Sequence, residues 1–386
     1  METECLKSEA VTSDVARTEQ DTVRHIYVHI PFCARICPYC AFYKERADPA
    51  QTQRFCDAIL KELGELALRF DVRAETIFFG GGTPTALSTE QLGMLLSGFR
   101  DVLDLSALRE WTIEANPGSV SARKAAMLTG LGVPRISLGV QSWDDGLLQM
   151  LGREHNAAQA EASFRILREA GLQNVSIDLM FGLPGQSLGQ WEQTLARTVA
   201  LEPDHISAYC LTYEEDTEFF ARQLRGEYRE DIETDAQFFE ATMRMLEAAG
   251  YQQYEISNYA RPGYESVHNR GYWSGANYLG IGPSAFSTVG EQRWQNIADY
   301  RIYSDRVLTG VSPIASVEPL SAEMKRGEQI ALSLRTRDGV PADWLAPWAA
   351  ERQEFIELGL LTASEDRFVL TPKGKLLADS VSAAFV

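Results

Sequence analysis

Three cysteines lie within eight residues of one another, and thiols at such spacing can bind a metal ion or an iron–sulfur cluster. The segment YVHIPFCARICPYCAF places Cys33, Cys37 and Cys40 at a C-x3-C-x2-C spacing. The other cysteines are scattered and are expected to be small hydrophobic residues: Cys5, Cys56 and Cys210. Because 6 cysteines in 386 residues are too few for a disulfide framework, the cluster indicates metal or redox chemistry.

The residue types alone leave three chemistries open for this cluster. A structural zinc site needs a fourth ligand, which His25, His29 or a distant cysteine would have to supply. A thioredoxin-like dithiol should open a helix, yet Pro38 and Tyr39 separate the last two thiols. An iron–sulfur cubane usually takes four thiolates, so three would leave one iron open to another ligand.

Short strand-like runs alternate with amphipathic helical patterns after residue 24, and these elements must position the cysteines. The expected strands begin at His25, Glu75, Glu110, Arg135, Asn174 and His205. The expected helices span 49–70, 88–103, 121–132, 156–171 and 187–201. Several of these helices open with a Ser or Asn cap, and two close near a glycine. Repeated β-α units predict parallel strands joined by right-handed crossovers.

Glycines and polar side chains follow the ends of successive predicted strands. The segment GGGTP (80–84) follows the second strand, and Glu114, Gln141 and Asp178 end the next three. Because α/β barrels and open sheets build their sites at the carboxyl ends of strands, these residues are expected to share one site. We therefore predict an α/β fold with a partial (β/α)6 TIM-like barrel.

The pattern changes in the last third of the chain. We expect a polar leader over 1–24, the barrel core over 25–250, a connecting segment over 251–315, and a C-terminal domain over 316–386. The connecting segment is rich in Tyr, Asn and Gly and has no helical period. Helical patterns followed by a hairpin-like tail predict a small, mainly helical, winged-helix-like C-terminal domain.

Composition argues against a nucleic-acid partner and excludes a membrane-spanning helix. With 36 basic and 54 acidic residues, the formal net charge is -18, which opposes binding to nucleic acid. No apolar run reaches the length of about 18 residues that a membrane-spanning helix needs. The first residues also lack an apolar signal region, so we expect a cytoplasmic protein.

The cysteine motif resembles that of the radical S-adenosylmethionine (SAM) superfamily, because an aromatic residue, Tyr39, stands between the second and third cysteine after a first strand. The resemblance implies a [4Fe–4S] cluster on Cys33, Cys37 and Cys40. It also implies that the amino and carboxylate groups of SAM bind the open iron. Reduction of the cluster can then cleave SAM to a 5′-deoxyadenosyl radical.

The same resemblance implies a set of SAM contacts along the chain. Gly81, Gly82 and Thr83 would meet the methionine end, and Arg153 would pair with its carboxylate. Polar side chains at the strand ends would bind the ribose and adenine: Glu114, Gln141 and Asp178. The aromatic residues Tyr27, Tyr39 and, from the segment GPSAFS, Phe286 would line the cofactor cavity.

Across residues 25–380 the chain is similar to the subfamily that contains oxygen-independent coproporphyrinogen III oxidase and the HemW haem chaperones. The oxidase carries a further cysteine two residues after the third ligand, where this sequence has Phe42. The oxidase also has a longer N-terminal region than the 24 residues expected here as a leader. Both departures favour the haem-chaperone branch.

The segment HNRGYW (268–273) resembles the HNxxYW signature to which haem binding is attributed in that branch. Neutral imidazole is a common axial ligand of haem iron, so His268 is expected to bind the iron. Tyr272 and Trp273 offer flat apolar area for the macrocycle.

We therefore expect a haem chaperone that carries a [4Fe–4S] cluster and SAM and delivers haem to haem-requiring partners, such as membrane respiratory enzymes. Two catalytic alternatives remain from the same resemblance. One is radical decarboxylation of coproporphyrinogen III, and the other is radical opening of the haem ring.

Overall fold

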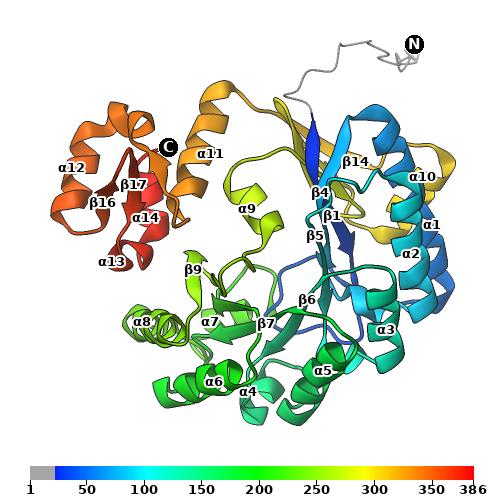
Figure 1. Cartoon of the computed structure of the whole chain (residues 1–386), viewed down its shortest axis with the longest axis horizontal. Helices are drawn as coiled ribbons and strands as arrows, with labels where there is room; N and C mark the ends of the chain where they lie inside the picture. The colour runs from blue at the N-terminus through cyan, green and yellow to red at the C-terminus, as the bar shows by residue number, and fades with distance from the viewer. Residues whose placement is uncertain (1–21) are drawn as a thin grey trace.

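Six parallel strands form the centre of the protein, and each pairs with the next one along the chain (Figure 1). The computed structural model describes residues 22–386. The strands are β1 (Val23–Ile30), β4 (Val72–Gly81), β5 (Glu110–Ala115), β6 (Arg135–Gln141), β7 (Asn174–Phe181) and β8 (His205–Cys210). They coincide with the six predicted strands and confirm the partial barrel.

The expected leader falls largely on residues that the structure does not describe, 1–21. Strand β1 already begins at Val23, two residues before the first strand expected from the sequence.

Helices cover the outer face of these strands. Five lie where the sequence predicted them: α1 (Pro49–Arg69), α2 (Thr89–Val102), α3 (Ala122–Gly130), α5 (Ala157–Glu169) and α6 (Leu188–Ala200). Helix α8 (Ile232–Ala248) also packs on this face, whereas the short helices α4 (Asp145–Met150) and α7 (Glu218–Leu224) were not predicted. Capping boxes open three of them, with Ser88, Asn156 and Ser187 as the N-caps. Local sequence therefore sets where these helices begin.

Alternation along β1 separates the two faces of the sheet. Ile26, Val28 and Ile30 are at most 1% exposed and belong to the hydrophobic core shared with the helices. Because side chains alternate along a strand, Tyr27 and His29 face the barrel interior. The interior therefore carries polar groups on the first strand.

Segment 251–315 adds strands to both edges of the same sheet, which the sequence did not predict. On the β8 edge lie β10 (Asn258–Ala260) and β9 (Gln252–Glu255). On the β1 edge lie β11 (Tyr278–Ile281), β12 (Phe286–Val289), β13 (Gln292–Asn296) and β14 (Ile314–Pro319). The resulting 12-stranded sheet ends at β14 and β9, so the barrel stays open. These strands are short and lack an alternating pattern, which explains why sequence periodicity missed them.

The HNRGYW segment also differs from expectation, since it forms the helix α9 (Val267–Trp273) inside the connecting segment, where the sequence shows no helical period. Ser266 caps this helix by accepting a hydrogen bond from the Asn269 amide. Seven helical residues are too few for a period to stand out in the sequence. Helix α9 packs against β4 of the barrel and α11 (Ala322–Leu334) of the C-terminal part.

The C-terminal part has a hydrophobic cluster and a three-stranded sheet of its own. Its strands are β15 (Val340–Pro341), β17 (Arg367–Leu370) and β16 (Leu361–Ser364), in that order. Its helices after α11 are α12 (Ala349–Glu357), α13 (Pro372–Lys375) and α14 (Ala378–Ala383). Residue 316, the expected boundary, lies inside β14 of the large sheet.

Three further elements complete the description: β2 (Phe32–Cys33), β3 (Glu45–Arg46) and α10 (Tyr300–Thr309), the last packed on α1. None of the helices within residues 22–386 combines the length and the apolar character needed to cross a membrane.

Candidate functional site

The cysteine loop, residues 31–46, follows the carboxyl end of β1. The small parallel pair β2 and β3 closes this loop. Cys33 ends β2, and its Sγ lies 3.6 Å from Oγ1 of Thr83, which follows β4. Cys33, Cys37 and Cys40 are free thiols that are neither fully buried nor fully exposed. Burial raises the pKa of the Cys33 and Cys40 thiols above the ordinary value.

Two glycines at the end of β4, Gly81 inside the strand and Gly82 just after it, let the cysteine loop lie close against the barrel. A Cβ on Gly82 would lie 2.7 Å from the backbone carbon of Pro31, and one on Gly81 would lie 2.5 Å from the His29 ring. The Gly82 amide donates to the Ile30 carbonyl at 2.8 Å, which extends the pairing of β1 and β4. These glycines are therefore required by contacts within the chain itself.

Three predicted residues meet inside the barrel from three different strands: Tyr27 on β1, Glu114 on β5 and Asp178 on β7. Burial, together with the charge of Asp178, raises the pKa of Glu114 to about 8, and the Gly81 amide donates to Glu114 Oε2 at 3.2 Å. Burial and the charge of Glu114 raise the pKa of Tyr27. Glu114 is therefore largely protonated near neutral pH.

Asp178 is held in place by two serine hydroxyls. Ser137 donates to both of its carboxylate oxygens, at 2.9 and 2.8 Å, and Ser176 donates to Oδ1 at 3.0 Å. These hydrogen bonds hold the carboxylate on the interior face of the sheet, where β7 pairs with β6 on one side and with β8 on the other.

Arg153 joins the cysteine loop to the end of β6. Its Nη2 donates to the Gly139 carbonyl at 2.7 Å, while Nη1 lies 3.7 Å from Cys37 Sγ and the buried Nε has no partner. Gln141 adopts a positive φ of 69°, and a Cβ on Gly139 would lie 2.9 Å from its Nε2. The structure therefore places Arg153 beside Cys37, and both Arg153 and Gln141 beside Gly139.

Tyr39, between the last two cysteines, packs against Phe219 of α7 with ring centroids 6.1 Å apart. Cys37 and Cys40 also line a cavity of about 390 Å³ with residues of the loop, α4 and α7. Basic side chains from the loop and α7 contribute to this cavity: Arg35, Lys44 and Arg222.

The two histidines considered as zinc ligands are engaged elsewhere. His29 Nδ1 lies 3.1 Å from the Tyr27 hydroxyl and Nε2 lies 2.9 Å from the Tyr43 carbonyl, while burial lowers the pKa of His29 to about 4. His25 Nδ1 lies 2.9 Å from the Thr76 hydroxyl. Within residues 22–386, no three His, Cys, Asp or Glu side chains gather around one point that could hold a metal ion. The thiolates of a cubane bind separate irons and need no common point, so the three thiols fit a cluster better than zinc.

Sequence reasoning missed that the His29 ring packs against Gly81 and hydrogen-bonds to Tyr27 and Tyr43. The alternation HIYVHI already places His25, Tyr27 and His29 on one face of a strand. Two other predicted residues come from segment 251–315. His268 on α9 is 1% exposed, and Phe286 lies on β12, two strands from β1, with 45% of its surface exposed. The expected roles of these two residues therefore remain predictions.

Comparison with known proteins identifies the family to which this chain belongs. The profile of the radical SAM superfamily matches residues 27–198, which hold the cysteine loop and most of the strand-end residues. The chain is 36% identical to the protein named heme chaperone HemW of Bacillus subtilis, over 94% of this chain and 99% of that one. The chain belongs to the HemW family.

Other members of the HemW family and its relatives show the same extent of similarity. The heme chaperone HemW of Escherichia coli is 34% identical over 94% of this chain and 97% of its own. The mitochondrial radical S-adenosyl methionine domain-containing protein 1 of Bos taurus is 34% identical over 92% and 82%. Among solved structures, coproporphyrinogen III oxidase (HemN) of Escherichia coli superimposes with a TM-score of 0.82 at 25% identity, covering 96% of this chain and 91% of that one. The radical SAM fold thus extends over nearly the whole described chain.

Proposed function

We propose that this protein is a haem chaperone, which binds haem and passes it to haem-requiring proteins such as respiratory enzymes. The observation that carries the proposal is the similarity, over more than nine-tenths of the chain, to proteins named heme chaperone HemW from several bacteria. We place it in the cytoplasm, because 6 cysteines in 386 residues do not provide the disulfide framework that is typical of secreted proteins.

We further propose that Cys33, Cys37 and Cys40 hold a [4Fe–4S] cluster. The support is the donor set: three thiols on one loop, with both nitrogens of the neighbouring His29 already hydrogen-bonded. When bound, the cluster supplies one open iron for SAM and an electron once it is reduced. Arg153, whose Nε has no partner, would bind the SAM carboxylate beside Cys37.

The remaining SAM contacts follow from the interior of the barrel. Glu114, protonated near neutral pH, can donate a hydrogen bond, whereas Asp178 accepts; together with Gln141 they can bind ribose hydroxyls and adenine edges. Residues Gly81, Gly82 and Thr83 would lie beside the methionine end. Tyr27 and Tyr39 would flank the cofactor, and Phe286 would complete its cavity.

For haem itself we propose the region of the HNRGYW motif, with His268 as the iron ligand expected from the sequence. His268 Nε2 is buried without a hydrogen-bond partner, and burial lowers the pKa of the imidazole, which keeps it neutral. The Tyr272 ring stands edge-on to His268 at 4.8 Å. His268→Ala should weaken the haem spectrum and leave the cluster absorbance unchanged.

The second candidate is coproporphyrinogen III oxidation, favoured by the overall superposition on HemN. Against it, Phe42 stands where the oxidase carries its additional cysteine, and 68% of its surface is exposed. One preparation separates the two. The protein is reconstituted anaerobically with iron and sulfide, and is then given either haemin or coproporphyrinogen III with SAM and a reductant. A stable Soret band without protoporphyrinogen is expected, whereas formation of protoporphyrinogen would establish the oxidase.

A further inference from the structure

Helix α9 crosses the open side of the barrel, and His268 on this helix faces inward. The helix follows β10, which pairs with β8, and precedes β11, which pairs with β1, so its segment joins the two sides of the open barrel. His268 Nδ1 lies 2.7 Å from the Thr76 hydroxyl of β4, and the Phe78 ring stacks on the imidazole with centroids 5.0 Å apart. Because His268 is 1% exposed, a haem iron cannot reach it while α9 stays in this position.

The barrel holds α9 through a small inner face, since the helix has only seven residues. Glu110 of β5 accepts hydrogen bonds from the Ser266 hydroxyl at 3.0 Å and from the Val267 amide at 2.6 Å. His268 Nε2, in contrast, is buried without a hydrogen-bond partner, which costs free energy in this closed position. Exposure of the imidazole removes that cost and offsets part of the contacts that are lost when α9 leaves the barrel.

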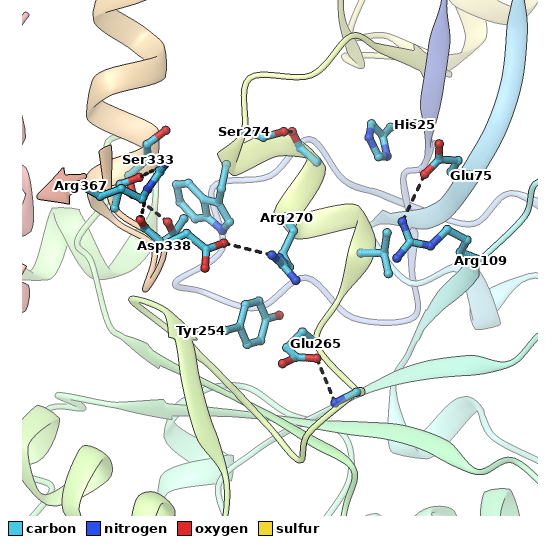
Figure 2. A pocket seen from close by; sticks show the side chains of 16 residues that line it. His25, Glu75, Arg109, Tyr254, Glu265, Arg270, Ser274, Ser333, Asp338 and Arg367 are labelled. Carbon is cyan, nitrogen blue, oxygen red and sulfur yellow. Dashed lines mark hydrogen bonds and ion pairs between the residues drawn. The ribbon is translucent and has the colours of Figure 1, made fainter. Parts of the chain in front are cut away.

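A cleft of about 570 Å³ lies behind the outer face of α9 (Figure 2). Arg270, Trp273 and Ser274 of α9 line one side of the cleft, and Ser333 and Asp338 of the C-terminal part line another. The interior of a protein is close-packed, so a helix can move only where such space exists beside it. The cleft gives α9 room to move away from the barrel.

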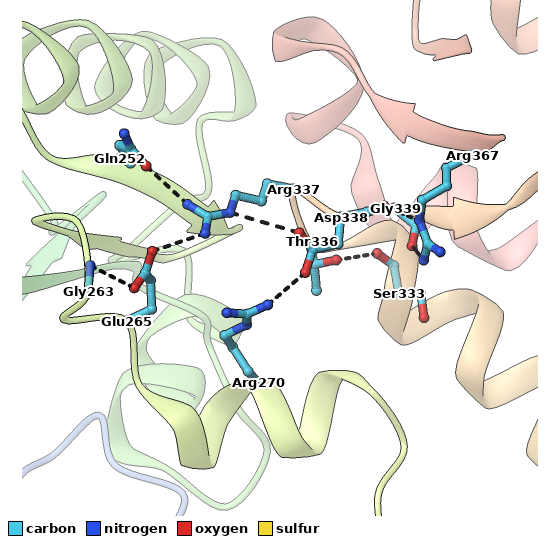
Figure 3. A network of polar contacts seen from close by, with 10 residues as sticks. All are labelled: Gln252, Gly263, Glu265, Arg270, Ser333, Thr336, Arg337, Asp338, Gly339 and Arg367. Carbon is cyan, nitrogen blue, oxygen red and sulfur yellow. Dashed lines mark hydrogen bonds and ion pairs between the residues drawn. The ribbon is translucent and has the colours of Figure 1, made fainter. Parts of the chain in front are cut away.

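Three contacts made by arginines join the C-terminal part to α9 and to the residues just before it, and we call them the latch. They are Arg270–Asp338 at 3.0 Å, Arg337–Glu265 at 3.0 Å, and Arg335 over the Trp273 ring at 5.5 Å. Figure 3 shows the two ion pairs. Arg270 and Asp338 are about half exposed, and exposed ion pairs stabilise little because water and salt screen them. The C-terminal part has its own hydrophobic cluster and sheet, so it can shift as a body once the latch breaks.

Glycines flank α9 on both sides. Gly263 has a φ of 87°, and Gly275 has a φ of 70°. Glycine adopts both signs of φ at low cost, so these positions can absorb the backbone rotation that a hinge needs. A Cβ on Gly275 would lie 2.8 Å from Gln329 of α11, so the end of α9 packs closely on the C-terminal part. The segment between the two glycines can therefore move as one piece when the C-terminal part releases it.

We propose that α9 is a gate, which the latch holds closed, and that haem reaches His268 when the C-terminal part releases α9 from the barrel. The inference rests on the haem-binding function and the iron ligand proposed above, and it adds how access to that ligand is controlled. In the open position Nε2 of His268 binds the iron, and Trp273 offers its flat face to the macrocycle. Because this bond forms only in the open position, haem shifts the population of the protein toward it.

Hydrogen–deuterium exchange with mass spectrometry tests the gate in the reconstituted, full-length protein without haem. Asp338→Ala removes the ion pair with Arg270. Peptides that cover α9 should then exchange about two- to fivefold faster than in the wild type, the factor expected for an exposed ion pair. Peptides that cover α5, on the outer face of the barrel, should exchange at the wild-type rate in the same variant.

Stopped-flow mixing with haemin tests whether the gate controls uptake. In the wild type the observed rate should level off as the haemin concentration rises, because opening of α9 precedes binding. Asp338→Ala should raise this limiting rate, and lower the apparent Kd, by about two- to fivefold. The gain should disappear when His268→Ala is added to Asp338→Ala, because the gate then no longer covers the iron ligand.

Controls separate the possible failures. Glu90→Gln breaks another exposed ion pair, between α2 and Arg123 of α3, and should leave both measurements at their wild-type values. If Asp338→Ala does not fold, Arg337→Gln opens the latch at its second ion pair. Wild-type rates in either measurement, in a folded latch variant, would overturn this inference alone. Failure of the wild-type protein to bind haemin would overturn the proposed function, whereas the exchange experiment would still decide whether the latch holds α9.

Discussion

Gly271 is the residue of α9 on which the position of the His25 ring depends, and replacing it by alanine tests this close packing. A Cβ at this position would lie 2.6 Å from Cε1 and Nε2 of His25 and 2.9 Å from Cδ2. The ring cannot swing away freely, because its Nδ1 is bonded to Thr76. The added methyl group must therefore displace either the ring or the helix.

One stabilising and two destabilising effects set the magnitude for Gly271→Ala. Alanine is favoured over glycine inside a helix by ~1 kcal/mol. Overpacking of a filled site costs ~1–3 kcal/mol, and loss of the His25–Thr76 hydrogen bond adds ~0.5–1.5 kcal/mol. We expect the substitution to lower the free energy of unfolding by ~0.5–3.5 kcal/mol.

Gly64 supplies the matched control. It lies inside α1, and a Cβ there would have no neighbour within 4 Å. Gly64→Ala should therefore raise the stability by ~0.5–1 kcal/mol. Urea unfolding of the two variants and the wild type, followed by circular dichroism, measures both effects. If Gly271→Ala unfolds at the same or a higher urea concentration than the wild type, the close contact between His25 and α9 is wrong.

Two further predictions concern the cofactor site. The pKa of Glu114 is raised from about 4.5 to about 8, so between these values the folded chain holds a proton that the unfolded chain has released. This carboxyl then contributes a fall in stability with rising pH of up to ~1.4 kcal/mol per unit. The contribution is best measured above about pH 6.5, because the lowered pKa values of His29 and His155 make stability rise with pH below that. Glu114→Gln should flatten the profile in urea unfolding of the cofactor-free protein, and an equally steep variant would contradict this assignment. Cys37→Ala should abolish the iron-linked absorbance after reconstitution, while Cys210→Ala, at an exposed thiol, should retain it; equal iron content in both would refute the cluster ligands.

Local sequence patterns predicted the barrel well, because each strand and helix carries its own signal. The alternation around Tyr27 marks β1, and Ser88, Asn156 and Ser187 mark helix starts through capping. The fold class followed, since repeated β-α units permit few topologies. The strands between 251 and 315 carry no such signal, because they form by pairing with sheet edges that are distant in sequence.

The residues of the candidate site also divide into those that local sequence singled out and those whose role only the structure revealed. Spacing alone identified Cys33, Cys37 and Cys40, because a metal-binding loop is local. Gly81 and Gly82 were expected to approach a cofactor. The structure shows that contacts with the His29 ring and with Pro31 already require glycine at these two positions. These contacts form between the ends of β1 and β4, so the sequence of either segment alone cannot predict them.

The sequence by itself determined the fold class, the cysteine loop and the strand-end residues, since these depend on short-range periodicity and spacing. Only the tertiary structure decided that His25 and His268 are both buried, at 7% and 1% exposed, and that both share the Thr76 hydroxyl. His25, Thr76 and His268 are far apart in the chain and meet because packing of α9 into the barrel brings them together. Access to a nitrogen lone pair is a property of that packing, which residue type cannot reveal.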